Sequence, residues 1–347
     1  MNYLHSPSEF ANSLASIGVV PRDFVFYLTS VCNLRCKHCY VGDALLDAAE
    51  SWRDDNACAL LHELELDRLT LIGGEPLLYY GINAVLESVC TARIREKRMT
   101  TNLTTLSDEN IAMLKSAAFR VSVSIDGPTA ELHDAIRGSG AFERTIRNLR
   151  RLVGAGVDVE VTHTVTPQIA SAFNNLVSLL RSLKVQRLNL HKVSAQGNAT
   201  ENRSLVMSAS QWRSFIETVQ KISAGQDGYE LPIIVRYPLL FVNALEYEQL
   251  KRDGYHHHVS GSYYSARGHR VVLYCSGEVF ISSEAFGTDA SIGRVVAGHF
   301  EANSTARNEI KLTQKAGFQI SDINPEIQGD TVFPIPLSFS YRRTITI

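Results

Sequence analysis

Three cysteines, Cys32, Cys36 and Cys39, lie within eight residues of one another, separated by three and then by two residues. They follow the apolar run 24–28, which predicts that they sit on the loop leaving a β-strand. Iron–sulfur clusters are held by cysteine thiolates at short, fixed intervals. A cubane cluster with three protein ligands keeps one iron open to another molecule, so this spacing predicts a centre that carries out chemistry.

Zinc binding and simple burial are the alternatives for these cysteines. A closed zinc site could combine them with His38 or with a distant histidine, since sites of three cysteines and one histidine are common. The three-then-two spacing is nevertheless not the usual zinc pairing. Burial in a core strand is disfavoured because the residues between the cysteines include Asn33, Arg35 and Lys37, which are too polar.

Length, charge and cysteine usage restrict the class of protein. The chain has 347 residues and a formal net charge of −2, which gives no electrostatic reason to expect nucleic acid or an anionic membrane as the main partner. No apolar run approaches the roughly 20 residues that span a bilayer, and residues 1–10 lack the pattern of a signal peptide. The remaining cysteines, Cys58, Cys90 and Cys275, are scattered, so no disulfide framework is expected. We therefore expect a cytoplasmic protein.

Six strand-like runs alternate with helical patterns in the first two thirds of the chain. The runs occupy residues 24–29, 68–72, 98–101, 120–125, 157–165 and 185–191. Helical patterns occupy residues 57–64, after a capping pair of Ser51 and Asp54, the segment after Ser107, and residues 142–153. This alternation predicts a parallel sheet with its helices outside. Curled into a partial barrel, such a sheet places its working loops at the carboxyl ends of its strands.

The second predicted strand runs directly into Gly73, Gly74, Glu75 and Pro76. Two glycines let the backbone approach a ligand closely, Glu75 supplies an acceptor, and Pro76 stiffens the exit. A tight turn before a helix is the alternative interpretation of this motif.

Polar residues also end the third and fourth predicted strands. Asn102 closes the third, and the alternation in the fourth places Ser122 and Ser124 on one face. Asp126 follows, in a segment that also fits an ordinary turn, so we do not include it among the catalytic residues. Arg137 ends the polar stretch after this strand.

Together these motifs resemble the radical S-adenosylmethionine (SAM) superfamily, and residues 121–140 resemble its SPASM/twitch-type subgroup, which acts on peptides and proteins. The resemblance implies a partial (β/α)6 radical SAM barrel at residues 23–205. It also implies one [4Fe–4S] cluster on Cys32, Cys36 and Cys39. SAM would chelate the fourth iron and yield a 5′-deoxyadenosyl radical on reduction by an external donor such as flavodoxin or ferredoxin.

The same resemblance implies which residues contact SAM. Gly73, Gly74, Glu75 and Pro76 would meet its amino group, with Asn102 near them. Ser124 would contact the ribose, Arg137 the carboxylate, and Leu190 would lie near the adenine. Residues 196–199 stand where the subgroup commonly has a Gly-Arg-Ala step, and the missing arginine is a departure.

The ends of the chain are expected to be simpler. Residues 1–22 are expected to be a short lead-in, and residues 206–347 a degenerate, SPASM/twitch-like mixed α/β domain that has lost its metal. Within the latter we expect helices at 210–223 and 239–252, an extended segment at 233–237, and a β-hairpin spanning 270–282. The tract 256–258 holds three adjacent histidines, which point in different directions and suit an exposed loop or a substrate-contacting surface better than one metal ion.

The function implied by the resemblance is hydrogen abstraction from a peptide, such as a ribosomally made precursor, leading to a crosslink or to epimerisation. Cys275 could return a hydrogen atom in an epimerase, although a packed core residue or the relic of a lost cluster is the favoured interpretation of this thiol. A radical SAM enzyme acting on a small molecule such as a sugar or nucleoside is one alternative. A non-catalytic iron–sulfur partner protein is another.

Overall fold

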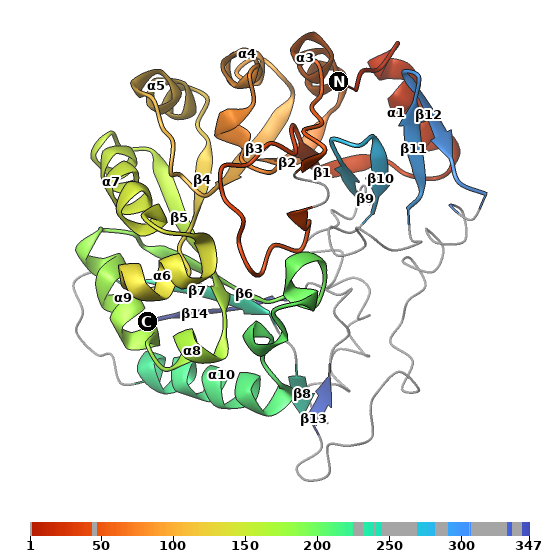
Figure 1. The fold of residues 1–347 in the computed structure, drawn as a ribbon. Helices are drawn as coiled ribbons and strands as arrows, with labels where there is room; N and C mark the ends of the chain where they lie inside the picture. Colours follow the sequence, from red (N-terminus) through yellow and green to blue (C-terminus); the bar gives the residue numbers. More distant parts are fainter. Residues whose placement is uncertain are drawn as a thin grey trace.

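A twelve-stranded sheet forms the centre of the described part of the chain, with helices covering its outer face (Figure 1), and two further strands form a separate small sheet. The computed structural model describes residues 2–43, 47–224, 232–238, 241–243, 269–281, 291–304, 306, 332–334 and 342–347. The strand order is β12-β11-β10-β9-β1-β2-β3-β4-β5-β6-β7-β14.

The first six strands pair in parallel and in chain order, which confirms the partial (β/α)6 barrel. They are β1 (Pro21–Tyr27), β2 (Leu66–Ile72), β3 (Ile94–Thr101), β4 (Arg120–Ser124), β5 (Asp158–Val165) and β6 (Arg187–Lys192). Each contains most of the corresponding predicted run, and β1 to β3 begin two to four residues earlier than predicted. All six carboxyl ends lie on the same rim, because the strands are parallel.

Helices connect these strands on the outside of the arc. They are α3 (Asp54–Glu63), α4 (Ile82–Ser88), α5 (Asp108–Ser116), α6 (Ala130–Arg137), α7 (Ala141–Gly154), α8 (Pro167–Ala170) and α9 (Phe173–Ser182). Ser107 caps α5 as predicted, with Asn110 as its partner in a capping box. The predicted capping pair before α3 is wrong, because the hydroxyl of Ser51 bonds Thr29 Oγ1 at 2.6 Å and α3 begins after Arg53 instead.

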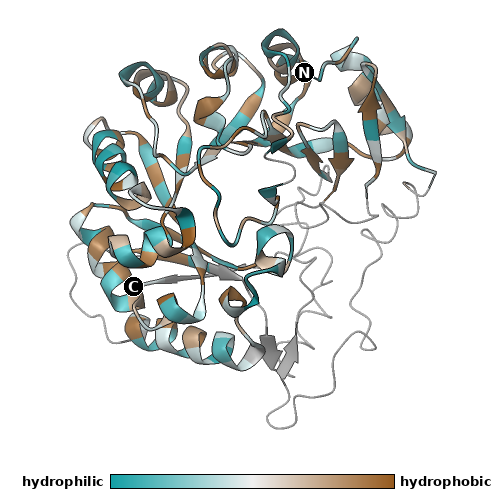
Figure 2. Ribbon diagram, viewed as in Figure 1, coloured by the Kyte–Doolittle hydropathy of each residue, from teal (hydrophilic) through white to brown (hydrophobic). Residues whose placement is uncertain are grey.

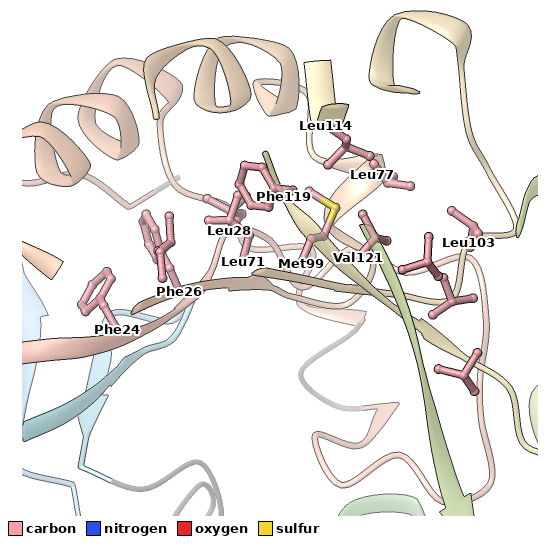
Figure 3. Packing of buried hydrophobic residues seen from close by; sticks show 14 of the residues in the cluster. Phe24, Phe26, Leu28, Leu71, Leu77, Met99, Leu103, Leu114, Phe119 and Val121 are labelled. Atoms are coloured by element: carbon pink, nitrogen blue, oxygen red, sulfur yellow. The ribbon is translucent and has the colours of Figure 1, made fainter. Parts of the chain in front are cut away.

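The two faces of the sheet carry different side chains, because successive residues of a strand point to opposite faces. Residues on the helix side are apolar and fully buried, as the labelled Phe24, Leu71 and Val121 show in Figure 3. The inner face carries alternating charges near the amino ends of the strands, including Arg68 and Glu96. Figure 2 shows the same alternation of apolar and polar positions along the strands.

Strands from the last third of the chain extend this sheet at both ends. β7 (Ile234–Pro238) pairs in parallel with β6, and β9 (His269–Leu273) pairs in parallel with β1. The sheet is completed by β10 (Glu278–Phe280), β11 (Gly293–Val296), β12 (His299–Ala302) and β14 (Arg342–Thr346). The predicted boundary near residue 205 therefore lies within a region whose flanking strands share one sheet.

Other elements of the last third meet expectation in part. The helix α10 (Ala209–Ala224) and the β9–β10 hairpin are where the sequence predicts them. The predicted helix 239–252 is wrong at β8 (Phe241–Asn243), which pairs with β13 (Val332–Pro334); its other residues lie outside the described ones. The histidine tract 256–258 also lies outside them.

The lead-in residues pack against an early helix and against a strand from the last third of the chain. The helix α1 (Pro7–Ser16) contacts β12 and α3, and Phe10 packs edge-on against Phe300. The Asn2 side chain donates to the carbonyl of Cys275. Within the described ranges, none of the helices combines the length and apolar character needed to cross a bilayer.

Candidate active site

The cysteine loop leaves β1 at the carboxyl rim and lies on the inner side of the arc in Figure 1. Its backbone is anchored to two other segments. Lys37 N donates to the Ile136 carbonyl of α6 at 2.9 Å. Asn198, in the short helix η2 (Gly197–Thr200), donates from Nδ2 to the Cys36 carbonyl at 3.1 Å and from its backbone to the Cys39 carbonyl at 2.9 Å. The loop is therefore held from both sides.

The three thiols are partly buried and have donors beside them. Leu34 N lies 3.5 Å from Cys32 Sγ, Asn102 Nδ2 lies 3.9 Å from the same sulfur, and Arg137 Nη1 lies 3.9 Å from Cys36 Sγ. Burial raises the pKa of Cys32 to about 11 and that of Cys36 to about 12, and it also raises the pKa of Cys39. A thiol binds iron as the thiolate, so binding of iron must release the thiol protons.

This donor set fits an iron–sulfur cluster. Thiolates on a cluster are stabilised by nearby N–H groups, which Cys32 and Cys36 have. Each thiolate of a cubane binds a different iron, so the three sulfurs need not converge on one point. Among the residues with described positions, no three His, Cys, Asp or Glu side chains converge as a single-ion site would require.

Gly73 and Gly74 lie against the backbone that leads into the cysteine loop. A Cβ at Gly73 would lie 2.5 Å from the Thr29 carbonyl oxygen, and one at Gly74 would lie 2.5 Å from the Val31 carbonyl oxygen. Gly74 N also donates to the Thr29 carbonyl at 2.7 Å. The glycines thus allow a close approach of backbone to backbone.

Glu75 is a buried acceptor between two strand ends. Its carboxylate accepts from Thr101 Oγ1 at 2.5 Å, from Asn102 N at 2.7 Å and from Leu77 N at 3.1 Å. Burial raises the pKa of Glu75 to about 7, although these hydrogen bonds oppose the shift. Pro76 opens the short helix η1 (Pro76–Leu78) that follows. A carboxylate offers about four acceptor positions, so one remains for a cofactor.

Asn102 touches the cysteine loop directly. Its Nδ2 donates to Asn33 Oδ1 at 3.1 Å, and its Oδ1 accepts from Thr104 N at 2.9 Å. Its backbone carbonyl accepts from Thr145 Oγ1 at 2.8 Å. The residue is therefore oriented by β3 and α7 before any cofactor binds.

Ser124 and Arg137 lie on the same rim. Ser124 is the last residue of β4, is 8% exposed, and is paired with Thr162 of β5. Arg137 ends α6, and its Nε donates to Asp126 at 2.5 Å while its Nη1 extends toward Cys36. The structure thus brings Arg137 to the cysteine loop, as its predicted role requires.

Two predicted site residues have side chains that are buried in the hydrophobic core. The side chain of Leu190 is fully buried in the core on the helix side of β6, so a contact of this side chain with adenine is not supported. Cys275 is also fully buried in that core, whereas its neighbour Tyr274 lies in the inner-face cluster with Tyr27. The thiol is therefore packed in the core beside Ser30 and is closed to a substrate, and we do not retain it as a hydrogen donor.

Two residues outside the loop, Asp126 and Asn198, contact it, and neither contact was predicted. His38 lies between two of the cysteines and bonds Asp126, and Asn198 lies in the segment that departs from the Gly-Arg-Ala step. Position within these motifs was the available signal for His38 and Asn198. Asp126 directly follows a strand end on the rim, but the turn interpretation explained it equally well.

Comparison with known proteins now defines the class. The sequence model of the Radical SAM superfamily matches residues 26–179, which span β1 to α9. This match implies a [4Fe–4S] cluster and SAM as cofactors. This agrees with the three thiols on the rim of the partial barrel.

Several characterised relatives share this region. An AdoMet-dependent heme synthase from Oleidesulfovibrio alaskensis is 27% identical over 54% of this chain and 50% of its own length. The antilisterial bacteriocin subtilosin biosynthesis protein AlbA of Bacillus subtilis is 25% identical over 58% of this chain and 46% of its own length. The chain thus spans about half the length of the curated relatives it matches.

The fold extends further than the sequence similarity. The crystal structure of Streptococcus suis SuiB bound to precursor peptide SuiA gives a TM-score of 0.61 at 15% identity, over 80% of this chain and 63% of that chain. The likeness covers elements beyond residue 206 as well as the barrel.

Proposed function

We propose that this chain is a radical SAM enzyme that abstracts a hydrogen atom from a peptide, in the maturation of a ribosomally made precursor by crosslinking or epimerisation. When bound, the cluster and SAM supply a 5′-deoxyadenosyl radical on reduction by an external donor such as flavodoxin or ferredoxin. The convergence of Cys32, Cys36 and Cys39 with Glu75 and Arg137 on one rim is the observation that carries the proposal.

The chain's own residues have distinct tasks in this proposal. Cys32, Cys36 and Cys39 hold the cluster. The carboxylate of Glu75 accepts from the SAM amino group, and the guanidinium of Arg137 binds the SAM carboxylate through its terminal nitrogens, because Nε is already bonded to Asp126. Gly73, Gly74, Pro76, Asn102 and Ser124 complete the SAM contacts.

The peptide substrate is supported by the relatives rather than by the site alone. AlbA belongs to the biosynthesis of a bacteriocin, and SuiB has been crystallised with a precursor peptide. A second candidate is a small-molecule substrate, which the similarity to AdoMet-dependent heme synthases favours. Both candidates use the same cluster and SAM, so they differ only in the substrate from which the radical abstracts a hydrogen atom.

The first experiment tests the chemistry. Protein reconstituted anaerobically with iron and sulfide is reduced in the presence of SAM, and 5′-deoxyadenosine is measured. We expect the wild type to form it and the triple variant Cys32→Ala/Cys36→Ala/Cys39→Ala to form none. Cys90→Ala is the matched control, since this exposed thiol lies outside the loop. Formation of 5′-deoxyadenosine by the triple variant would exclude the cluster site, and its absence in iron-loaded wild type would favour the non-catalytic partner protein.

The second experiment tests the substrate. Short peptides encoded beside the gene are incubated with the active enzyme, and their mass and stereochemistry are compared before and after. A crosslink removes hydrogen atoms and lowers the mass of the peptide. Epimerisation in deuterated water replaces one hydrogen atom of the peptide by deuterium and so raises its mass slightly. If no peptide changes while a tetrapyrrole, sugar or nucleoside does, the small-molecule alternative replaces the peptide.

A further inference from the structure

The carboxylate of Asp126 joins the cysteine loop to the rest of the rim. Asp126 Oδ2 accepts from His38 Nε2 at 2.6 Å and from Arg137 Nε at 2.5 Å. Its Oδ1 accepts from Thr164 N at 3.0 Å. One side chain therefore receives donors from the cysteine loop, from α6 and from the end of β5.

This carboxylate is charged despite being fully buried. Burial opposes the ionisation of Asp126, but the guanidinium of Arg137 and the imidazole of His38 outweigh it and hold the pKa well below its usual range. The backbone N–H of Asp126 also donates to His133 Nδ1 at 3.2 Å. A buried charge with this many partners fixes the positions of the groups that it pairs.

Its two partners on Oδ2 lie next to the sulfur ligands. His38 is placed between Cys36 and Cys39 in the chain, and Arg137 Nη1 lies 3.9 Å from Cys36 Sγ. Because Arg137 bonds Asp126 through Nε, the plane of the guanidinium is set while its terminal nitrogens extend toward the loop. The same carboxylate thus orients a loop residue and the arginine proposed to bind SAM.

We propose that Asp126 is a positioning residue that couples the cysteine loop to the SAM-binding arginine. Retention of the cluster and affinity for SAM then depend on one buried carboxylate that contacts neither directly. The proposal rests on the cluster and SAM of the proposed function, but not on a peptide substrate.

The test replaces Asp126 by Asn, which keeps the shape but removes the charge. In the reconstituted protein, we expect a chelator to remove iron about tenfold faster and the Kd for SAM to rise about tenfold, as for other residues that orient metal ligands. The EPR spectrum of the reduced cluster should also shift less on adding SAM. Asp126→Glu should not restore these properties, because the longer side chain moves the carboxylate away from His38 and Arg137.

Asp134→Asn is the matched control. Asp134 lies on α6 and accepts from Gly140 N and Phe142 N, so its replacement removes a carboxylate with two partners but leaves the cysteine loop alone. We expect iron loss and SAM affinity as in the wild type. Equal values for Asp126→Asn and Asp134→Asn at matched thermal stability would overturn the proposal.

A second variant keeps the test decisive if Asp126→Asn does not fold. His38→Phe removes only the loop contact, and we expect faster loss of iron to the chelator with a smaller change in SAM affinity. Wild-type iron retention in His38→Phe would overturn the coupling. A wild type that forms 5′-deoxyadenosine but modifies no peptide would contradict the proposed substrate and leave this inference standing.

Discussion

Glu75 shows how one side chain can serve both the fold and the cofactor. Its carboxylate is bonded by Thr101, Asn102 and Leu77, so it holds the end of β2 to the end of β3. Asn102 in turn contacts Asn33 of the cysteine loop. A change at Glu75 should therefore affect the packing of these strand ends as well as SAM binding.

We expect Glu75→Gln to raise the Kd for SAM about tenfold and to lower the free energy of unfolding by about 1–3 kcal/mol, while iron content stays near that of the wild type. The amide cannot accept as a charged oxygen does, and its NH₂ group faces donors. Titration with SAM and denaturant unfolding measure the two effects. Glu87→Gln, on the exposed side of α4, is the control. Unchanged SAM affinity with a normal cluster spectrum would leave Glu75 with its structural role alone.

The sequence predicts the site residues that belong to a motif. It does not predict which face of the sheet a side chain occupies, or which residues far apart in the sequence come into contact. The cysteines, Asn102 and Arg137 converge as the motifs imply. The side chain of Leu190 lies on the helix side of β6, because a shift of one residue along a strand moves a side chain to the opposite face. The bond between His38 and Asp126 joins residues 88 positions apart, which no local pattern contains.

At the scale of elements, the backbone of the turn after β2 lies in close contact with the backbone of the loop after β1. Gly74→Ala would place a methyl group 2.5 Å from the Val31 carbonyl oxygen, so the cysteine loop must shift. We expect this variant to retain clearly less iron after reconstitution than the wild type. Gly154→Ala is the control, because a Cβ at the end of α7 meets nothing within 4 Å. Equal iron content in the two variants would show that the loop does not need this close approach.

The amino ends of the strands are joined by ion pairs across the inner face. Glu96 of β3 accepts from Arg68 Nε at 2.7 Å, from Arg98 Nη2 at 2.6 Å and from Arg120 Nη1 at 3.2 Å. Burial opposes its ionisation, but these guanidiniums outweigh burial and lower the pKa of Glu96 to about 2. The contacts link β2, β3 and β4 at the end of the barrel opposite the cysteine loop.

Glu96 should therefore make stability depend on acid. Because its pKa is lower in the folded protein than the ordinary 4.5, ionised Glu96 stabilises the fold above that value, and this contribution is lost as the pH falls toward 2. We expect Glu96→Gln to be less stable than the wild type by about 1–2 kcal/mol at pH 7, after solvent screening, with the difference vanishing toward pH 2. Denaturant unfolding from pH 7 to pH 3 measures it. Glu63→Gln, at an exposed end of α3, should show no such trend.

The elements themselves were largely predictable, because each βα pair is local in sequence and its periodicity is strong. The first six strands and α5, α7 and α10 lie close to their predicted ranges. The pairing of β9 with β1 was not predictable, since it joins segments at opposite ends of the chain. Residues 206–347 were predicted to form a smaller C-terminal domain, and their described strands β7 and β9 pair with the barrel strands β6 and β1.

At the scale of the whole molecule, an aromatic cluster on the inner face ties the late strands to the site. Tyr274, at the end of β9, stacks on Tyr27 of β1 with ring centroids 4.1 Å apart, and Tyr40 packs against the same cluster. Tyr40 follows Cys39 directly. A residue from the last third of the chain therefore packs on the same aromatic cluster as the end of the cysteine loop.

We expect Tyr274→Ala to lower the free energy of unfolding by about 3–5 kcal/mol, as for other large buried aromatic residues. It should also reduce iron retention, because Tyr40 loses a packing partner. Tyr274→Phe, which keeps the ring, should retain iron like the wild type. Calorimetry and iron analysis check both, and normal iron content in a folded Tyr274→Ala protein would separate the aromatic cluster from the loop.

The place of β1 in the sheet has a consequence for how the protein is made. Its neighbour on one side, β2, follows within 40 residues of β1, but its neighbour on the other side, β9, begins only at residue 269. At 5–20 residues per second, a ribosome needs roughly 10–50 s to reach β9 after completing β1. During that interval β1 presents an unpaired edge directly before the three thiols of the cysteine loop. The sheet around the site is therefore complete only once β9 has been translated, so we expect cluster insertion to follow synthesis of that strand.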